Sequence, residues 1–140
     1  MHAIVIYESM TGHTRRAAEL IGAELVRAGH RATVFSTADI DYQALSTADM
    51  VIVGTWTDGV FVLGQRPGGA SRLRRLPVLE RMKAVVFCTY ALDPGRTLSK
   101  LTAIVSERGA NVLGGLAIRR NNLEGGARDL VGRLLEGVEA

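Results

Sequence analysis

The sequence contains a single cysteine, Cys88, which excludes an internal disulfide and a metal site made of several cysteines. Cys88 lies in the apolar segment 85–88, so we expect a buried and unreactive thiol. The three histidines, His2, His13 and His30, are not spaced as metal ligands, so no metal site is predicted. No serine or cysteine lies in a nucleophile motif, and the sequence therefore predicts no catalytic residue.

Long apolar segments are also missing from the chain. No run of about 18 apolar residues could span a membrane, and the first strand begins at once, without a signal peptide before it. We therefore expect a cytoplasmic protein whose partners do not include a membrane. Hydrophobic residues make up 47% of the 140 residues, which is enough to form a core, and we expect a single domain over residues 1–140.

The charge of the chain is small but unevenly distributed. The formal net charge is +3 at pH 7, and the segment 66–83 holds a single acid, Glu80, among its basic residues. A local excess of one sign is typical of a surface that binds an oppositely charged partner. The basic residues that we expect to form such a docking surface are Arg66, Arg72, Arg74 and Arg75. The alternative is a solvated loop without a role, because many charge runs are only that.

Apolar segments alternate with segments of helical periodicity along the chain. Strands are predicted over 4–7, 32–35, 50–53, 84–88 and 112–118, and helices over 17–28, 96–108 and 123–138. Pro67 and Pro77 bracket another segment, 68–81, in which only a short helix fits. Gly114 and Gly115 inside the last strand indicate a bulge or a close approach. Together the segments favour an α/β fold with a doubly wound five-stranded parallel sheet, order 2-1-3-4-5, whose ligand crevice lies between strands one and three.

The loop between the first strand and the first helix is rich in hydroxyl groups. It comprises Ser9, Met10, Thr11, Gly12, His13 and Thr14. The first turn of a helix has unpaired N–H donors and the positive end of the helix dipole, and Gly12 lets the backbone approach a ligand closely. The segment therefore predicts a phosphate site at a helix N-terminus. An ordinary helix capped by Thr11 or Thr14 would give a similar pattern.

The spacing of this loop resembles that of a known family. Tyr7, Ser9, Thr11, Gly12 and Thr14 form the pattern aromatic-x-Ser-x-Thr-Gly-x-Thr, which resembles the phosphate loop of flavodoxins. The resemblance implies a flavodoxin-like fold and flavin mononucleotide (FMN) as the cofactor. It also implies the short-chain type, since the chain has no room for the long insertion of larger flavodoxins. The loop lacks the Gly-Lys-Ser/Thr of nucleoside-triphosphate sites, so a monophosphate fits it better.

Two further loops follow the third and fourth predicted strands, at the same edge of the sheet. In flavodoxins such loops hold the isoalloxazine ring of FMN. The resemblance thus assigns to ring binding Thr55, Trp56, Thr57, Asp58 and Gly59 in the first loop, and Thr89, Tyr90, Ala91 and Gly95 in the second. Trp56 and Tyr90 would stack on the ring; the alternative is that each only covers the edge of the sheet. The Asp58–Gly59 peptide is where the resemblance predicts a backbone turnover on reduction, because glycine tolerates positive φ. The alternative is an ordinary Asp-Gly turn, in which Gly59 only bends the chain.

The resemblance implies an FMN-binding electron-transfer protein that exchanges electrons with a redox partner protein. Flavodoxins that carry electrons are usually acidic, whereas this chain is basic, so we expect an acidic protein partner and no nucleic acid. Two alternatives stay open: a small FMN-dependent NAD(P)H or quinone reductase, and a flavin-free module that keeps the fold and only docks. The segment 60–69 either covers the ring or belongs to the docking surface.

Overall fold

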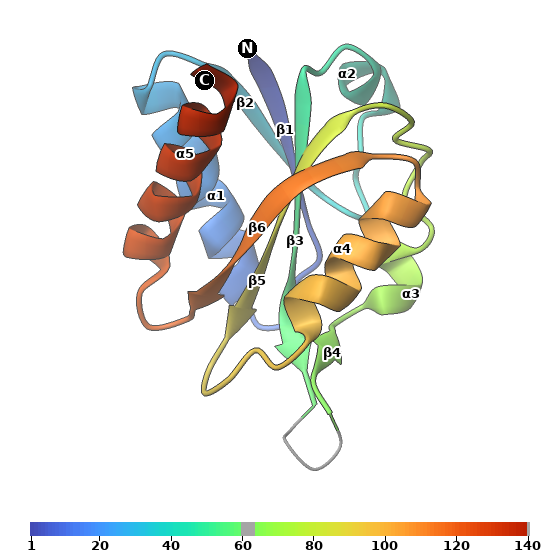
Figure 1. The fold of residues 1–140 in the computed structure, drawn as a ribbon, viewed down its shortest axis with the longest axis vertical. Coiled ribbons are helices and arrows are strands. Elements are labelled where there is room, and N and C mark those ends of the chain that lie inside the picture. The colour runs from blue at the N-terminus through green and yellow to red at the C-terminus, as the bar shows by residue number, and fades with distance from the viewer. Residues whose placement is uncertain (60–63, 140) are drawn as a thin grey trace.

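The computed structural model describes residues 1–59 and 64–139. Within these residues a parallel sheet has the strand order β2-β1-β3-β5-β6, and a short strand, β4, pairs antiparallel with β3 (Figure 1). The strands are β1 (His2–Tyr7), β2 (Arg31–Ser36), β3 (Met50–Asp58), β4 (Arg66–Pro67), β5 (Lys83–Tyr90) and β6 (Asn111–Arg119). Apart from β4, this is the predicted five-stranded order 2-1-3-4-5, so the predicted fold class is confirmed.

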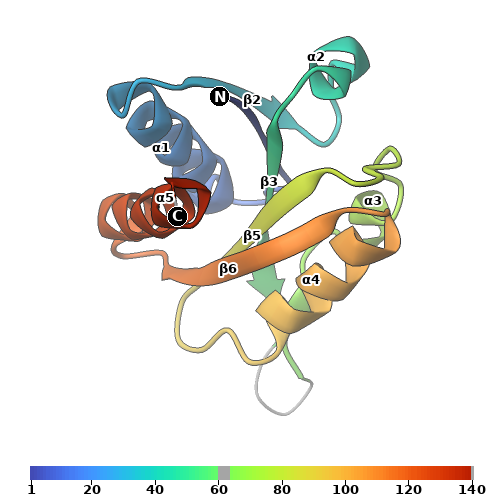
Figure 2. The same cartoon turned by 45° about the horizontal axis from the view of Figure 1, so that its top comes forward.

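Helices cover both faces of the sheet (Figures 1 and 2). One face carries α1 (His13–Arg27) and α5 (Leu123–Glu139), and the other carries α2 (Tyr42–Ser46), α3 (Ala70–Leu73) and α4 (Thr97–Glu107). Successive β1 residues point to opposite faces, so Ala3 and Val5 pack with α1 and α5, whereas Ile4 and Ile6 pack in the core beneath the other helices. All four are fully buried, which explains why β1 reads as a continuous apolar run.

The third predicted strand, 50–53, is longer than expected, because β3 continues to Asp58. Its pairing with β5 extends to Trp56, and its last residues pair with β4. Thr55, Trp56 and Thr57 are all good strand formers, so the local sequence is compatible with this extension. The prediction of a loop directly after residue 53 is therefore wrong, and most of that segment is strand.

Packing explains why a glycine lies inside β3. The ring of Phe87, on the neighbouring strand, occupies the place where a Cβ of Gly54 would be. The glycine thus marks a close approach inside the core and not the end of the strand. Strand β4 was not predicted either, since it has two residues, one of them Pro67, and so carries no periodicity.

The fourth predicted strand, 84–88, is also longer than expected, because β5 continues to Tyr90, so Thr89 and Tyr90 lie in the strand and not in the loop after it. The remaining elements agree with the predictions. Helix α3 is as short as the bracketing prolines imply, and the pairing of β5 with β6 is irregular at Leu113, next to the predicted glycine pair. Helix α1 begins at His13, before its apolar periodicity becomes visible at Ala17, and Gly12 is its N-cap residue. Among the residues described, no helix is long and apolar enough to cross a membrane.

Candidate cofactor-binding site

The three predicted loops follow strands that end at one edge of the sheet. β3 lies between β1 and β5, and the three strands are parallel, so their carboxyl ends meet at the lower end of the sheet in Figure 1. The register pairs Tyr7–Gly54 and Trp56–Thr89 lie toward this edge. The structure therefore brings the predicted phosphate loop beside the two predicted ring segments.

The loop from Ser9 to Gly12 connects β1 to α1 with most of its donors unused. Gly12 has a φ of 97°, and no atom lies within 4 Å of the place where its side chain would begin. Its N–H group donates to Oγ of Ser9 at 3.2 Å. Within the described ranges no acceptor is found for five N–H groups from the loop and the start of α1, those of Ser9, Met10, Thr11, His13 and Thr14. Unpaired N–H groups and hydroxyls without a metal ion or lysine are a donor set that fits a phosphate monoester.

Thr14 connects the phosphate loop to the second ring segment. Its Oγ1 lies 2.8 Å from Oγ1 of Thr89, and the two residues are only 1% and 2% exposed. Both were predicted to contact the cofactor, and the structure places their hydroxyls against each other. Because each hydroxyl has one O–H donor, the pair uses one of the two donors and leaves the other available.

The two aromatics predicted to stack on the ring are half-buried, and protein atoms lie against each. The indole of Trp56 lies on the backbone of Gly68, where a Cβ would overlap the ring, and the Gly68 N–H donates to the Trp56 carbonyl at 2.8 Å. The guanidinium of Arg119 lies 5.5 Å from the centre of the Tyr90 ring, which is a cation–π contact. Stacking of either side chain on a flavin remains a prediction.

The two threonines of the first ring segment also have buried hydroxyls. Oγ1 of Thr55 donates to the Gly68 carbonyl at 2.5 Å, so this side chain ties the β3–β4 hairpin together. Oγ1 of Thr57 has no hydrogen-bond partner in the part of the chain that is described. Burial raises the pKa of the Cys88 thiol, on the neighbouring strand β5, to about 11. The thiol is therefore protonated at neutral pH, as expected of a buried cysteine.

The turn after β3 begins with Asp58 and Gly59. The carboxylate of Asp58 forms an ion pair with Arg66 of β4 at 3.3 Å, and both side chains are about half exposed. Gly59 has a φ of 93°, and a Cβ at this position would overlap the carbonyl oxygen of Gly64. The turn thus needs glycine both for its φ and for this close approach.

The segment after β5 contacts the β3–β4 hairpin through Gln65. Gly95 has a φ of 54°, and its backbone lies against the Gln65 side chain. Nζ of Lys100 donates to the Gln65 carbonyl at 2.9 Å. Ala91, also predicted to contact the ring, is half-buried. The second predicted ring segment therefore packs on the hairpin that continues from the first, a contact that no local pattern indicated. Residues 60–63, part of the segment expected to cover the ring or to dock, lie outside the described residues.

Glu8 is a charged residue at this edge that the sequence did not assign to the site. It lies directly before the phosphate loop and is only 4% exposed. Its carboxylate accepts hydrogen bonds from Nη1 of Arg72 at 3.0 Å and from the hydroxyl of Thr37. Arg72 is 64 residues away in the sequence, so only the fold reveals the pair.

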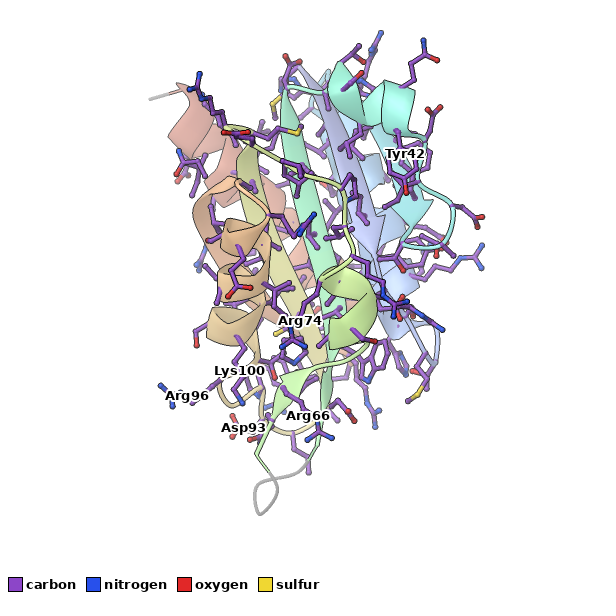
Figure 3. All side chains as sticks on the ribbon, turned by 90° about the vertical axis from the view of Figure 1, so that its right-hand side faces the viewer. Tyr42, Arg66, Arg74, Asp93, Arg96 and Lys100 are labelled. Carbon is purple, nitrogen blue, oxygen red and sulfur yellow. The ribbon has the colours of Figure 1, made fainter. Side chains whose placement is uncertain are left out.

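The four arginines predicted to form a docking surface have different surroundings. Arg66 and Arg72 each form an ion pair with a carboxylate. Arg74 and Arg75 are exposed, and neither has an ion-pair partner among the described residues. A groove of about 580 Å³ lies beside β4, α3 and α4, and its charged lining residues are Arg66, Arg74 and Lys100 together with one acid, Glu107 (Figure 3). We call it the basic groove. The cations of the groove thus come from three parts of the chain.

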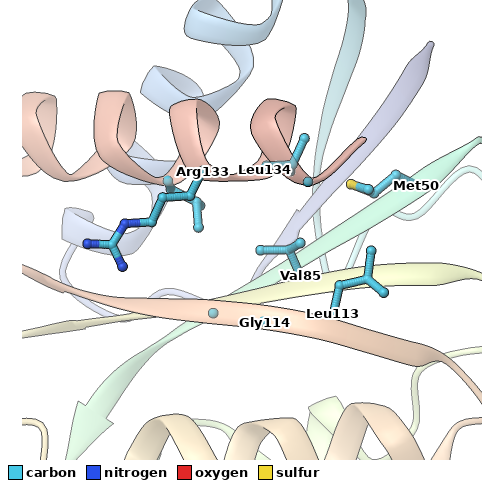
Figure 4. Close-up of a pocket in the computed structure, with 9 residues that line it drawn as sticks. Met50, Val85, Leu113, Gly114, Arg133 and Leu134 are labelled. Atoms are coloured by element: carbon cyan, nitrogen blue, oxygen red, sulfur yellow. The ribbon is translucent and has the colours of Figure 1, made fainter. Parts of the chain in front are cut away.

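A second hollow, of about 490 Å³, lies between α5 and the sheet (Figure 4). It is mainly apolar, with Met50, Val85 and Leu134 among its lining residues and Arg133 at one side. None of the predicted cofactor residues lines it. In the ranges that the structure describes, no group of three or more His, Cys, Asp or Glu side chains could hold a metal ion.

Comparisons with known proteins agree with this geometry. The protein-family model described as Flavodoxin matches residues 5–131. A cysteine mutant of the flavodoxin from Pseudomonas aeruginosa superposes with a TM-score of 0.75 at 18% identity, covering 100% of both chains. Oxidised Flavodoxin 2 from Bacillus cereus gives 0.73 at 21% identity, with 98% of this chain and 99% of that chain covered. At these identities the likeness shows the fold alone, and no curated protein sequence matches the chain.

Proposed function

The chain belongs to the flavodoxin family, whose cofactor is FMN, and we propose that it is an electron-transfer protein that exchanges electrons with a partner protein. Bound FMN supplies the redox chemistry, while the residues of the chain hold the cofactor, orient it and control what reaches it. The observation that carries the proposal is the row of unpaired N–H donors at the start of α1, beside Gly12.

In this proposal neutral donors bind the phosphate of FMN. The unpaired N–H groups of the loop and the hydroxyls of Ser9, Thr11 and Thr14 supply them, and the positive end of the α1 dipole adds to their effect. The flavin ring lies between the segments that carry Trp56 and Tyr90. The other residues proposed to contact it are Thr55, Thr57, Asp58, Gly59, Thr89, Ala91 and Gly95.

Binding of FMN and of riboflavin, which lacks the phosphate, tests the proposed phosphate site. Ser9→Ala removes a hydroxyl from the loop, and we expect FMN to bind at least several-fold more weakly, because a hydrogen bond to a charged group contributes about 1.5–3 kcal/mol. Riboflavin binding should be unchanged. The control is Ser106→Ala, an exposed serine on α4, which should affect neither ligand. An equal loss of both flavins in Ser9→Ala would contradict the assignment.

Turnover without a partner protein separates the proposed electron carrier from a reductase. An electron carrier loaded with FMN should oxidise NADPH negligibly when only a quinone is added, since its electrons arrive through another protein. Rapid NADPH oxidation under these conditions would instead support the reductase. A protein that takes up no FMN would leave the fold with a docking role alone.

We also infer that the partner docks beside the ring segments, on Arg74, Arg75 and the basic groove. β4 supplies Arg66 to this groove and pairs with Thr57 and Asp58, so the groove borders the first ring segment. A partner with an acidic surface matches its charge, and such complementarity acts mainly on the rate of association. Arg72, predicted for the same surface, contributes less because its guanidinium is paired with Glu8.

A further inference from the structure

We propose that Arg72 is the counter-ion that makes the buried carboxylate of Glu8 compatible with a phosphate in the neighbouring loop. Arg72 is thus a positioning residue for phosphate affinity, although it lies outside the loop. The inference rests on the proposed binding of FMN, and it concerns two residues that the flavodoxin-like phosphate pattern does not include.

The contacts of Glu8 fix its carboxylate, which belongs to the residue directly before the phosphate loop. Its backbone N–H donates to the Gly54 carbonyl at 3.0 Å, which holds the residue against β3. Its side chain packs on the backbone of Gly69, at the start of α3, where a Cβ would come within 2.5 Å of the carboxylate. Thr37, after β2, donates its hydroxyl to the same carboxylate. Three parts of the chain therefore hold Glu8 in place.

A fixed carboxylate at this place opposes the binding of an anion. Ser9 follows Glu8 directly, and the loop itself offers only neutral donors. Arg15 and Arg16, the next basic residues, both pair with Glu19. Arg72, whose Nη1 lies 3.0 Å from Oε2 of Glu8, is the cation that neutralises this carboxylate. With the ion pair intact, the approaching phosphate meets a net charge of zero from these two groups.

A purely structural ion pair is the alternative, since the same contact also joins α3 to the end of β1. The two roles differ in which flavin they affect. Removing one partner of a structural pair leaves an unpaired buried charge, so FMN and riboflavin would be weakened alike, and removing both partners would restore the two flavins alike. Balanced charges would instead affect FMN alone, and the double variant would bind FMN like the wild type because its net charge at this place is again zero.

The experiment compares FMN and riboflavin dissociation constants, measured by quenching of flavin fluorescence, in the wild type, Arg72→Met, Glu8→Gln and the double variant. Arg72→Met should weaken FMN by about fivefold or more at low ionic strength, the order expected for one uncompensated charge near a dianion. Glu8→Gln should bind FMN at least as tightly as the wild type. The double variant should lie within about twofold of the wild type, and riboflavin should be unaffected throughout.

Two controls separate charge balance from a general loss of basic residues or of folding. Lys83→Met removes an exposed cation at the start of β5 that has no ion pair in the described part of the chain, and it should leave both flavins unchanged. Arg72→Lys keeps the charge and should bind FMN within about threefold of the wild type. The difference between wild type and Arg72→Met should shrink as salt is added, because screening weakens a charge effect but not a packing effect.

Three results would overturn the inference: equal FMN affinity in the wild type and Arg72→Met, equal losses of FMN and riboflavin, or a double variant as weak as Arg72→Met. Each of them leaves the proposed function standing, provided that the wild type binds FMN more tightly than riboflavin. If the wild type binds no FMN, the proposed function itself fails. The two failures are therefore distinguishable in the same titration.

Discussion

The hydroxyl pair of Thr14 and Thr89 gives a sharp prediction about the candidate site. It joins the first turn of α1 to the last residues of β5, and both side chains are almost fully buried. Valine has nearly the same shape as threonine but no hydroxyl. Thr14→Val therefore removes the hydrogen bond with little change in packing, and it leaves the Thr89 hydroxyl buried without its partner.

The expected loss of stability follows from that unpaired hydroxyl. A typical hydrogen bond contributes about 0.5–1.5 kcal/mol to stability, but a buried group left without its partner costs about 1–3 kcal/mol. Thr14→Val and Thr89→Val should each lower the free energy of unfolding by about 1–3 kcal/mol. Replacing both hydroxyls removes the unpaired group as well. The double variant should therefore be more stable than either single variant.

Urea unfolding of the four apoproteins, followed by far-UV circular dichroism, measures these free energies. The losses must be non-additive, as expected for two residues in direct contact. A double variant whose loss equals the sum of the single losses would refute the pairing. Flavin titration adds a functional test, because Thr14 also belongs to the proposed phosphate site and Thr89 to the ring site. FMN should be weakened more than riboflavin by Thr14→Val, whereas Thr89→Val should affect the two flavins alike.

Three further predictions concern the ring segment, the cysteine and the docking surface. Gly59→Ala places an alanine at positive φ, which costs about 1–2 kcal/mol, and makes its Cβ overlap Gly64, so it should narrow the gap between the two one-electron potentials of bound FMN. The control is Gly64→Ala, which is strained at φ 76° but has no overlap. An equal effect of this control would show that the backbone turnover is not at residue 59. The pKa of the Cys88 thiol is about 11 in the folded protein, so the thiol of the unfolded chain ionises first as the pH rises. Between about pH 8 and pH 10.5 the free energy of unfolding should therefore fall by about 2 kcal/mol more in the wild type than in Cys88→Ala. An equal fall in the two proteins would contradict this. Replacing Arg74 and Arg75 by glutamate should slow electron transfer from the reduced protein to anionic ferricyanide and remove most of the salt dependence of this rate. The control is a cationic ruthenium ammine, which the same variant should reduce faster than the wild type does.

Much of the fold could be predicted because the sheet is covered on both faces. β1 has four consecutive buried residues, so its apolar run stands out, and the apolar faces of α1 and α5 follow helical spacing. The extension of β3 could not be predicted in this way. Beyond Gly54 the strand alternates polar and aromatic residues before an Asp-Gly turn, and its continuation depends on pairing with β4, a strand of two residues.

The candidate site, like the fold, could be predicted only in part from the sequence. The phosphate loop is contiguous in sequence, so its hydroxyls, its glycine and the following helix could be recognised together. The contacts that organise it are distant in sequence: Thr14 lies 75 residues from Thr89, and Glu8 lies 64 residues from Arg72. Neither pair has a local pattern. Buried polar groups need partners, and which partner is near depends on the fold.

The ion pairs also lower the effective charge of the docking surface below the value counted from the sequence. Counted in the sequence, Arg66, Arg72, Arg74 and Arg75 contribute four positive charges. In the structure the first two each lie against a carboxylate, so at distances beyond the ion pairs the set acts with a net charge of about +2. Long-range attraction of an acidic partner therefore depends mainly on Arg74 and Arg75. Neutralising Arg66 would change the hairpin more than the rate of association, because it would leave its carboxylate partner unpaired.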